Sequence, residues 1–291
     1  MPNPAPSHAN AARDDVEPDS RAFYRHMMEA LRADGVPFLV GGAFAFAHYT
    51  GIRRNTKDLD LFILRRDWER VEQVVRAAGY QAELTFPHWL AKVHRGDAFI
   101  DLIFNSGNGV SPVEESWFAA APEVELLGVP VRLTPPEETL WTKAFIMERE
   151  RYDGADVAHL LQSCAETLDW PRLRLLFGEN WRVLLSHLVL FGFVYPGERD
   201  RLPVWLIDEL SEQLRREARA AERGAPLCAG TLLSREQYLP DVDGGYRDGR
   251  STRRSTMGPE DVAAWTEAIE SRPARPAEPA EPGDRAGRAA G

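Results

Sequence analysis

A glycine pair followed by a pair of aspartates constrains this chain more than any other feature of its sequence. The apolar segment Phe38-Leu-Val-Gly-Gly42 ends in two glycines, and Asp58-Leu-Asp60 follows it. Side chains two residues apart in a strand point the same way, so Asp58 and Asp60 share one face while the flanking leucines point into a core. Adjacent carboxylates repel each other unless a cation lies between them. The pattern therefore predicts a metal site on a strand.

Gly41-Gly42 lies where a strand is expected to pass into a helix. Because glycine has no Cβ, the backbone N–H groups there can approach an anion closely, and a helix N-terminus adds positive potential. A tight strand-to-helix turn without a ligand would use the same residues. The nearby Asp58 and Asp60 favour the phosphate-binding interpretation.

Asp101 is the single charged residue in the apolar segment Ala98-Phe-Ile-Asp-Leu-Ile-Phe104. Strand alternation places it on one face with Phe99 and Ile103. A carboxylate inside an apolar strand needs a cation or several hydrogen-bond donors. We therefore predict that Asp101 joins the two earlier aspartates at one metal site; the alternative is a structural aspartate.

Composition narrows the class of protein. The chain has 291 residues, 44% of them hydrophobic, and a net charge of −10, which argues against a protein that coats nucleic acid by charge. Cys164 and Cys228 provide no disulfide framework and suit a reducing, cytoplasmic compartment. The most apolar run, 183–195, is shorter than the roughly 20 residues that cross a bilayer. We expect it to be a buried helix and expect no membrane association.

Periodicity and turn residues predict an α/β front half followed by helices. The expected regions are a disordered tail over 1–20, an α/β domain over 21–165, a helical region over 166–225, a loop-rich extension with a short helix over 226–271, and a disordered tail over 272–291. Strands are expected over 37–41, 58–64, 81–86, 91–94 and 98–104, with a hairpin over 124–133. Helices are expected over 21–33, 43–49, 66–78, 136–150, 153–166, 170–195 (broken near Gly178), 203–222 and 259–271. We assign no role to 226–258.

Three segments in this order resemble the nucleotidyltransferase core of the DNA-polymerase-β superfamily. They are Leu39-Val-Gly-Gly42, Thr56-Lys-Asp-Leu-Asp-Leu61 and Phe99-Ile-Asp-Leu-Ile103. The resemblance covers roughly residues 21–165, and it identifies the α/β domain as a nucleotidyltransferase domain. It implies an α+β fold with a mixed sheet flanked by helices and a site with two Mg²⁺ ions. It also implies transfer of a nucleoside monophosphate from an NTP such as ATP to an acceptor, with release of pyrophosphate.

The resemblance implies a role for each matching residue. Asp58 and Asp60 would bind both ions, and Asp101 would complete the site of the ion that activates the acceptor oxygen and could receive its proton. Gly41 and Gly42 would hold the triphosphate. Many family members have serine after the first glycine, so Gly42 removes one hydroxyl contact to phosphate and leaves the backbone donors.

The helix that contains Lys143 is similar to the C-terminal helices of predicted nucleotidyltransferases related to bacterial abortive-infection toxins. There a helical lysine and a later aspartate belong to the active site. The similarity implies that Lys143 contacts NTP phosphates and that Asp153 or Asp156 orients it. In the alternative, Lys143 lies on a solvated helix face, paired with the neighbouring Glu137 or Glu138.

Lysine is rare in this chain. Only Lys57, Lys92 and Lys143 occur among 35 basic residues. Coding composition explains such a bias most simply, but each lysine is also a candidate for a role that needs a compact charge. Arg53, Arg54 and Lys57 either attract a polyanion or form a solvent-facing loop.

The sequence leaves the acceptor open between RNA, a protein and a small molecule, and the net negative charge slightly favours the last two. Two alternatives to a housekeeping enzyme also remain. One is a nucleotide-binding module without turnover. The other is a toxin that an inhibitory partner protein holds in check.

Overall fold

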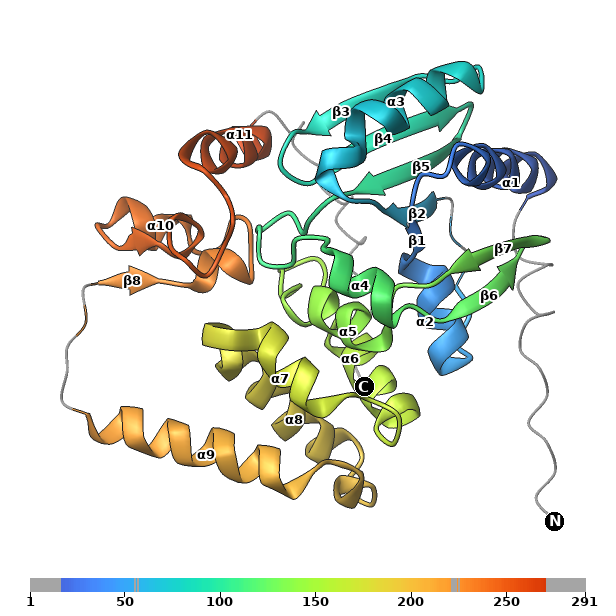
Figure 1. The fold of residues 1–291 in the computed structure, drawn as a ribbon. Helices are drawn as coiled ribbons and strands as arrows, with labels where there is room; N and C mark the ends of the chain where they lie inside the picture. Colours follow the sequence, from blue (N-terminus) through green and yellow to red (C-terminus); the bar gives the residue numbers. More distant parts are fainter. Residues whose placement is uncertain (1–16, 55, 57, 221–223, 225, 271–291) are drawn as a thin grey trace, which may run out of the picture.

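A five-stranded sheet organises the first half of the chain (Figure 1). Its strands are β1 (Leu39–Val40), β2 (Asp58–Phe62), β3 (Ala82–Phe86), β4 (Leu90–Arg95) and β5 (Ala98–Ile103), in the order β1-β2-β5-β4-β3. The computed structural model describes residues 17–54, 56, 58–220, 224 and 226–270. β2 and β5 pair in parallel, and the other neighbours are antiparallel. The predicted mixed sheet flanked by helices is confirmed.

One face of the sheet packs against α1 (Pro18–Ala33) and α3 (Trp68–Ala77). Leu61 of β2 and Leu102 of β5 point to this side and are fully buried, as strand alternation predicts. Helix α1 begins inside the stretch expected to be a tail. Pro18 in its first turn and Asp19 after it suit a helix N-terminus, which the sequence interpretation placed three residues too late.

The helices on the other face are α2 (Gly42–Thr50), α4 (Glu115–Ala120), α5 (Pro136–Ala144) and α6 (Gly154–Cys164). Helix α4 was not predicted, although it buries Trp117 and Phe118. The predicted hairpin is present as β6 (Glu123–Leu126) and β7 (Val129–Arg132). Helix α5 ends before the predicted residue 150, because Met147 and Tyr152 pair across a turn.

A helical region follows, made of α7 (Trp170–Phe177), α8 (Trp181–Val194) and α9 (Val204–Arg219). The predicted break at Gly178 is confirmed, and this glycine has a positive φ of 44°. The expectation that 183–195 is buried is wrong for one face of α8, because Val189 and Phe193 are 64% and 83% exposed. No helix in the described part of the chain is long and apolar enough to cross a bilayer.

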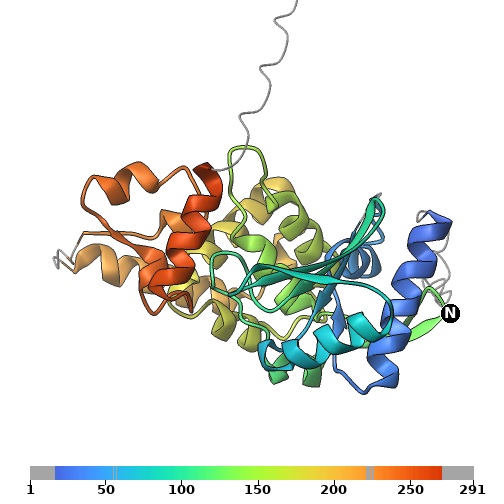
Figure 2. The ribbon, with the colours of Figure 1, turned by 90° about the horizontal axis from the view of Figure 1, so that it is seen from above.

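Residues 227–270, here called the C-terminal segment, follow α9. They contain β8 (Leu227–Cys228), α10 (Leu239–Asp243), β9 (Arg247–Asp248) and α11 (Pro259–Glu270). β8 and β9 pair in parallel, and Asp248 forms a buried ion pair with Arg250 at 2.7 Å. Figures 1 and 2 show this segment at one end of the molecule, with α11 beside the β3–β4 hairpin. Short elements joined by loops precede α11, the last described helix.

Candidate active site

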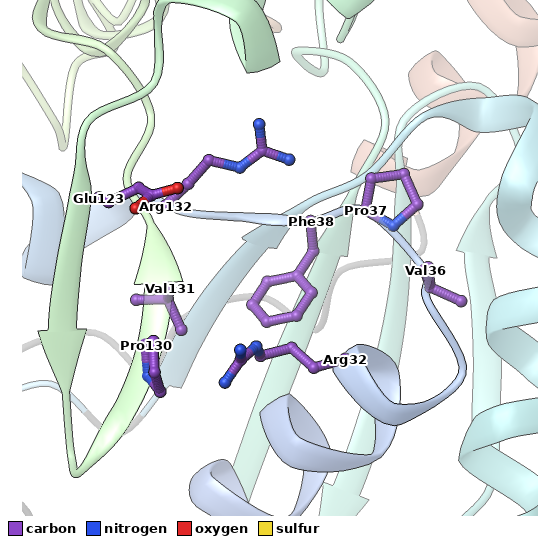
Figure 3. Close-up of a pocket in the computed structure, with 8 residues that line it drawn as sticks. All are labelled: Arg32, Val36, Pro37, Phe38, Glu123, Pro130, Val131 and Arg132. Atoms are coloured by element: carbon purple, nitrogen blue, oxygen red, sulfur yellow. The ribbon is translucent and has the colours of Figure 1, made fainter.

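The acidic residues singled out in the sequence line a cavity of about 430 Å³ between the sheet, α5 and the C-terminal segment. Gly41, Gly42 and Lys143 line the same cavity. A second cavity of about 350 Å³ lies between α1 and the β6–β7 hairpin (Figure 3), and none of its lining residues was a candidate in the sequence. The candidate residues therefore gather in the first cavity.

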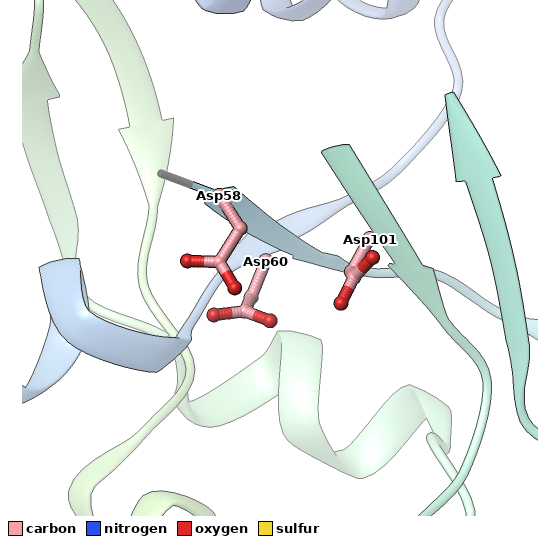
Figure 4. A group of neighbouring side chains, drawn as sticks. All are labelled: Asp58, Asp60 and Asp101. Carbon is pink, nitrogen blue, oxygen red and sulfur yellow. The ribbon is translucent and has the colours of Figure 1, made fainter. Parts of the chain in front are cut away.

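Asp58, Asp60 and Asp101 point toward one another from β2 and β5 (Figure 4). One carboxylate oxygen of each lies within 4.8 Å of the others. The cause is the register of the parallel pair, which places Asp60 directly opposite Asp101. Asp58 and Asp60 share a face because they are two residues apart in β2.

The environment of Asp60 disfavours its charged form. Burial, and then the negative charges of Asp58 and Asp101, raise the pKa of Asp60 to about 7, against the opposing effect of Lys143 and Arg151. Carboxylate oxygens are the ligands that Mg²⁺ prefers, and a bound divalent cation would relieve this repulsion. The donor set and its excess of negative charge therefore fit a divalent metal ion.

The glycine turn lies against the acidic residues. Gly42 opens α2 with a positive φ of 53°, and a Cβ atom on it would lie 1.6 Å from Asp60 Oδ2. A side chain at position 42 would therefore collide with Asp60. The first turn of a helix leaves backbone N–H groups without intrahelical partners. The turn therefore offers anion-binding donors next to Asp60.

Lys92 was not assigned to the site from the sequence. It lies opposite Asp101 across the β4–β5 pair, and its Nζ donates a hydrogen bond to Asp101 Oδ1 at 2.5 Å. Burial raises the pKa of Asp101, and the ammonium group of Lys92 opposes that rise. One oxygen of Asp101 is thus paired with a cation while the residue stays within reach of Asp58 and Asp60.

Lys143 lies at the side of the cavity nearest α6. Its Nζ is 2.8 Å from Asp156 Oδ2 and 3.2 Å from Asp153 Oδ2, so both candidate aspartates contact it. Each aspartate has a second cation, since Arg54 pairs with Asp156 and Arg151 with Asp153. Burial raises the pKa of Asp153, but hydrogen bonds from Arg151 and the charge of Lys143 hold it below its usual value.

The alternative placement of Lys143 is wrong. Its side chain is only 15% exposed, and Glu137 and Glu138 are buried and pair with Arg172 instead. In the basic cluster before β2, Arg54 forms an ion pair with Asp156, and Lys57 lies outside the described residues.

Residues 19–177, more than half of the chain, match the family described as "Uncharacterised nucleotidyltransferase". The chain belongs to this nucleotidyltransferase family. The predicted enzyme class is therefore confirmed, and the protein transfers a nucleotide group. A comparison with curated proteins finds no match.

Several solved structures are similar to this nucleotidyltransferase. The antibiotic-resistance factor ANT(2'')-Ia is 18% identical, with 70% of this chain and 96% of that chain covered and a TM-score of 0.36. The lincosamide antibiotic adenylyltransferase LnuA with bound lincomycin is 16% identical, with coverages of 50% and 98% and a TM-score of 0.36. An antigenic nucleotidyltransferase-like protein from Paracoccidioides brasiliensis is 15% identical, with coverages of 64% and 93% and a TM-score of 0.42.

The nucleotidyltransferase cavity also has walls that the sequence interpretation missed. Arg151 lines it, as do Thr231, Leu232, Leu233, Ser234, Arg235 and Trp265 of the C-terminal segment. Lys92 could have been found from the strands expected over 91–94 and 98–104, because pairing them as a hairpin brings Lys92 opposite Asp101. The residues of the C-terminal segment gave no such signal, since they approach the site only through contacts between distant parts of the chain.

Asp60→Asn removes a carboxyl group whose ionisation the fold opposes. The ordinary pKa of the group is 3.8 and that of Asp60 is about 7, so between these values the folded state binds more protons than the unfolded state. Stability of the wild-type protein therefore falls as pH rises through this window. In the presence of a metal chelator, we expect the melting temperature of Asp60→Asn to rise relative to that of the wild type between about pH 5 and about pH 8.

Asp97→Asn, in the exposed turn between β4 and β5, is the matched control and should follow wild type at every pH. A difference between Asp60→Asn and wild type that stays constant over this range would contradict an unbalanced charge at Asp60.

Gly42→Ala tests the contact between the glycine turn and Asp60. The added methyl group collides with Asp60 Oδ2 in a backbone conformation that alanine disfavours, so we expect a loss of about 2 kcal/mol or more in urea unfolding. Gly51→Ala is the control, because Gly51 also has a positive φ and its Cβ would meet nothing within 4 Å. Equal losses in the two variants would show that only backbone strain is involved.

Proposed function

We propose that this nucleotidyltransferase moves a nucleoside monophosphate from an NTP to a hydroxyl group of an acceptor and uses divalent magnesium. The acceptor oxygen forms a bond to the α-phosphorus, and the bond from that phosphorus to the bridging oxygen of the β-phosphate breaks. Pyrophosphate leaves, and the acceptor hydroxyl loses its proton. The convergence of Asp58, Asp60 and Asp101 beside the glycine turn carries this proposal.

Asp58 and Asp60 would hold two Mg²⁺ ions, with Asp101 completing the site of one. Bound ions supply charge stabilisation for the attacking and leaving oxygens of an in-line displacement. Asp101 would also accept the acceptor proton, a role that suits a carboxyl group whose pKa burial raises. Lys92 holds Asp101 in place through the ion pair between the two side chains.

Gly41, Gly42 and Lys143 would bind the triphosphate. The first turn of α2 supplies backbone N–H donors, and Lys143 supplies a compact positive charge at the opposite wall of the same cavity. Asp153 and Asp156 both orient Lys143. An NTP between these two groups would place its α-phosphate near the three aspartates.

Two further parts of the proposal rest on the sequence. Free thiols at Cys164 and Cys228 suit a reducing compartment, so we place the protein in the cytoplasm. Membership in a nucleotidyltransferase family favours an enzyme over a non-catalytic nucleotide-binding module. An inhibitory partner, as in a toxin–antitoxin pair, stays a prediction.

Incubation with each α-³²P-labelled NTP, Mg²⁺ and cell extract tests the transfer directly. Asp60→Asn should lower the rate of labelling by about 100-fold or more, because it removes a ligand of the Mg²⁺ ions that would stabilise the charge of the transition state. Asp97→Asn, which makes the same chemical change in an exposed turn, should label at the wild-type rate. Full transfer by a folded Asp60→Asn protein would rule out the metal assignment.

Lys143→Met tests the nucleotide-binding role. The variant should fold, because Arg151 and Arg54 still pair with Asp153 and Asp156. Loss of the charge should weaken the binding of a fluorescent ATP analogue by about tenfold, equivalent to about 1.4 kcal/mol. Lys143→Arg should retain part of the affinity, and unchanged binding by Lys143→Met would remove this residue from the site.

A further inference from the structure

The C-terminal segment supplies one wall of the active-site cavity, although it lies outside the family-matched residues 19–177. The residues that line the cavity from this side lie in 231–235 and at Trp265. In Figure 1 the segment lies beside the sheet, with α11 next to β3. It therefore borders the cavity from outside the family-matched part of the chain, which holds the three aspartates and the glycine turn.

The segment is fastened to the loop that follows β5. Asn105 Nδ2 donates to Thr256 Oγ1 at 2.8 Å, and Asn108 Nδ2 donates to the carbonyl oxygen of Leu232 at 2.5 Å. Ser255 Oγ donates in turn to the carbonyl oxygen of Asn108 at 2.8 Å. Side chains of both the loop and the C-terminal segment donate these hydrogen bonds, so the loop holds the segment in one position.

The segment is also fastened to the turn after α5. Glu148 accepts hydrogen bonds from Ser234 Oγ at 2.5 Å and from the backbone N–H of Arg235 at 2.7 Å. The backbone N–H of Met147 donates to the carbonyl oxygen of Leu233 at 3.0 Å. The segment thus contacts the cavity at two places, the loop after β5 and the turn after α5, and forms one of its walls.

The residues that line the cavity fall into two groups around the three aspartates. The first group, here called the first arm, contains the glycine turn and Lys143. The second group, the second arm, follows β5, because strand alternation places Ile103 and Asn105 on the same face as Asp101, and all three line the cavity. Trp89 and Trp265 belong to the second arm, and Trp265 packs on Gly107 of the loop after β5.

The end of the second arm is aromatic. The Trp265 ring meets Phe86 and Trp89 edge-on, with centroids 4.7 and 5.3 Å apart, and the Arg235 guanidinium lies 3.7 Å from its centroid. A Cβ atom on Gly107 would lie 2.8 Å from the Trp265 ring, so the ring packs directly on the loop after β5. These contacts hold Trp265 in one orientation beside Trp89, and both rings line the cavity.

The charged side chains of this arm are engaged within the protein. Glu148 binds the segment itself, and Arg235 donates to the carbonyl oxygen of Trp265 at 2.6 Å. Proteins that bind a nucleic acid strand need a basic groove that follows its backbone. Once the ions neutralise the acidic trio, the second arm still has Glu148 on its wall and its Arg235 is used in contacts within the protein, which opposes such a groove.

We propose that the C-terminal segment forms the acceptor-binding wall of the site, and that the acceptor is a small hydroxyl-bearing molecule with an apolar or aromatic face. The inference rests on the proposed nucleotidyl transfer. The acceptor packs against Trp265 and Trp89, and its hydroxyl group reaches Asp101 along β5. A cavity of about 430 Å³ has the size of a small-molecule site, which suits a small acceptor better than a folded RNA or a protein surface.

Separation of labelled cell extract by size tests the acceptor class. The extract is incubated with the α-³²P-labelled NTP and Mg²⁺, then divided into a low-mass filtrate, RNA and protein. We expect the label in the low-mass filtrate. Label on RNA, label on protein, or no label in any fraction while nucleotide binding is intact would each overturn the inference.

Trp265→Ala then tests the wall, with unlabelled low-mass filtrate of the extract as the source of acceptor and α-³²P-labelled NTP as the donor. We expect kcat/KM for the filtrate to fall by about tenfold, the effect of losing one aromatic contact of about 1.4 kcal/mol. Binding of the fluorescent ATP analogue should stay within about twofold of wild type. Trp205→Ala, at a half-exposed position on α9, is the control and should change neither value.

Trp265→Phe keeps an aromatic ring and should recover most of the rate, which separates a binding role from a folding defect. Unchanged kcat/KM in Trp265→Ala, or an equal loss of nucleotide affinity, would overturn the acceptor assignment. If the wild-type protein binds neither nucleotide nor Mg²⁺, the proposed function itself would be overturned.

Discussion

The repulsion among three carboxylates brought to one face of a sheet is the constraint on which the site depends. The parallel pairing of β2 with β5 sets Asp60 opposite Asp101, and no packing of neutral groups can offset that charge. Two kinds of compensation surround the trio. Lys92 neutralises one side of it, and Lys143 and Arg151 lower the pKa of Asp60 from the other. The remaining excess of negative charge makes this position suitable for divalent cations.

Much of the fold and the core of the candidate site could be predicted from the sequence because the relevant signals are local. Alternation in Asp58-Leu-Asp60 and around Asp101 depends only on strand geometry, and Gly178 breaks a helix by its own backbone preference. The domain boundary near residue 165 and the roles of the site residues stay predictions.

Contacts between distant parts of the chain could not be predicted. Glu148 holds Ser234 and Asn105 holds Thr256, and each pair joins residues that no sequence period relates. The prediction of which residues are buried fails for a similar reason. Phe193 belongs to an apolar run but lies on the face of α8 that no other described element covers closely, so apolar character alone placed it wrongly in a core.

The rare lysines acquire a physical explanation from the site. A guanidinium group binds a carboxylate through two parallel hydrogen bonds, which would engage both oxygens of Asp101. Lys92 engages Oδ1 with a single ammonium group. Lys143 likewise places one compact charge between Asp153 and Asp156, each of which also holds an arginine. In a chain where arginine is the usual cation, a lysine contacts one oxygen of Asp101, and another lysine contacts two aspartates whose oxygens arginines also bind.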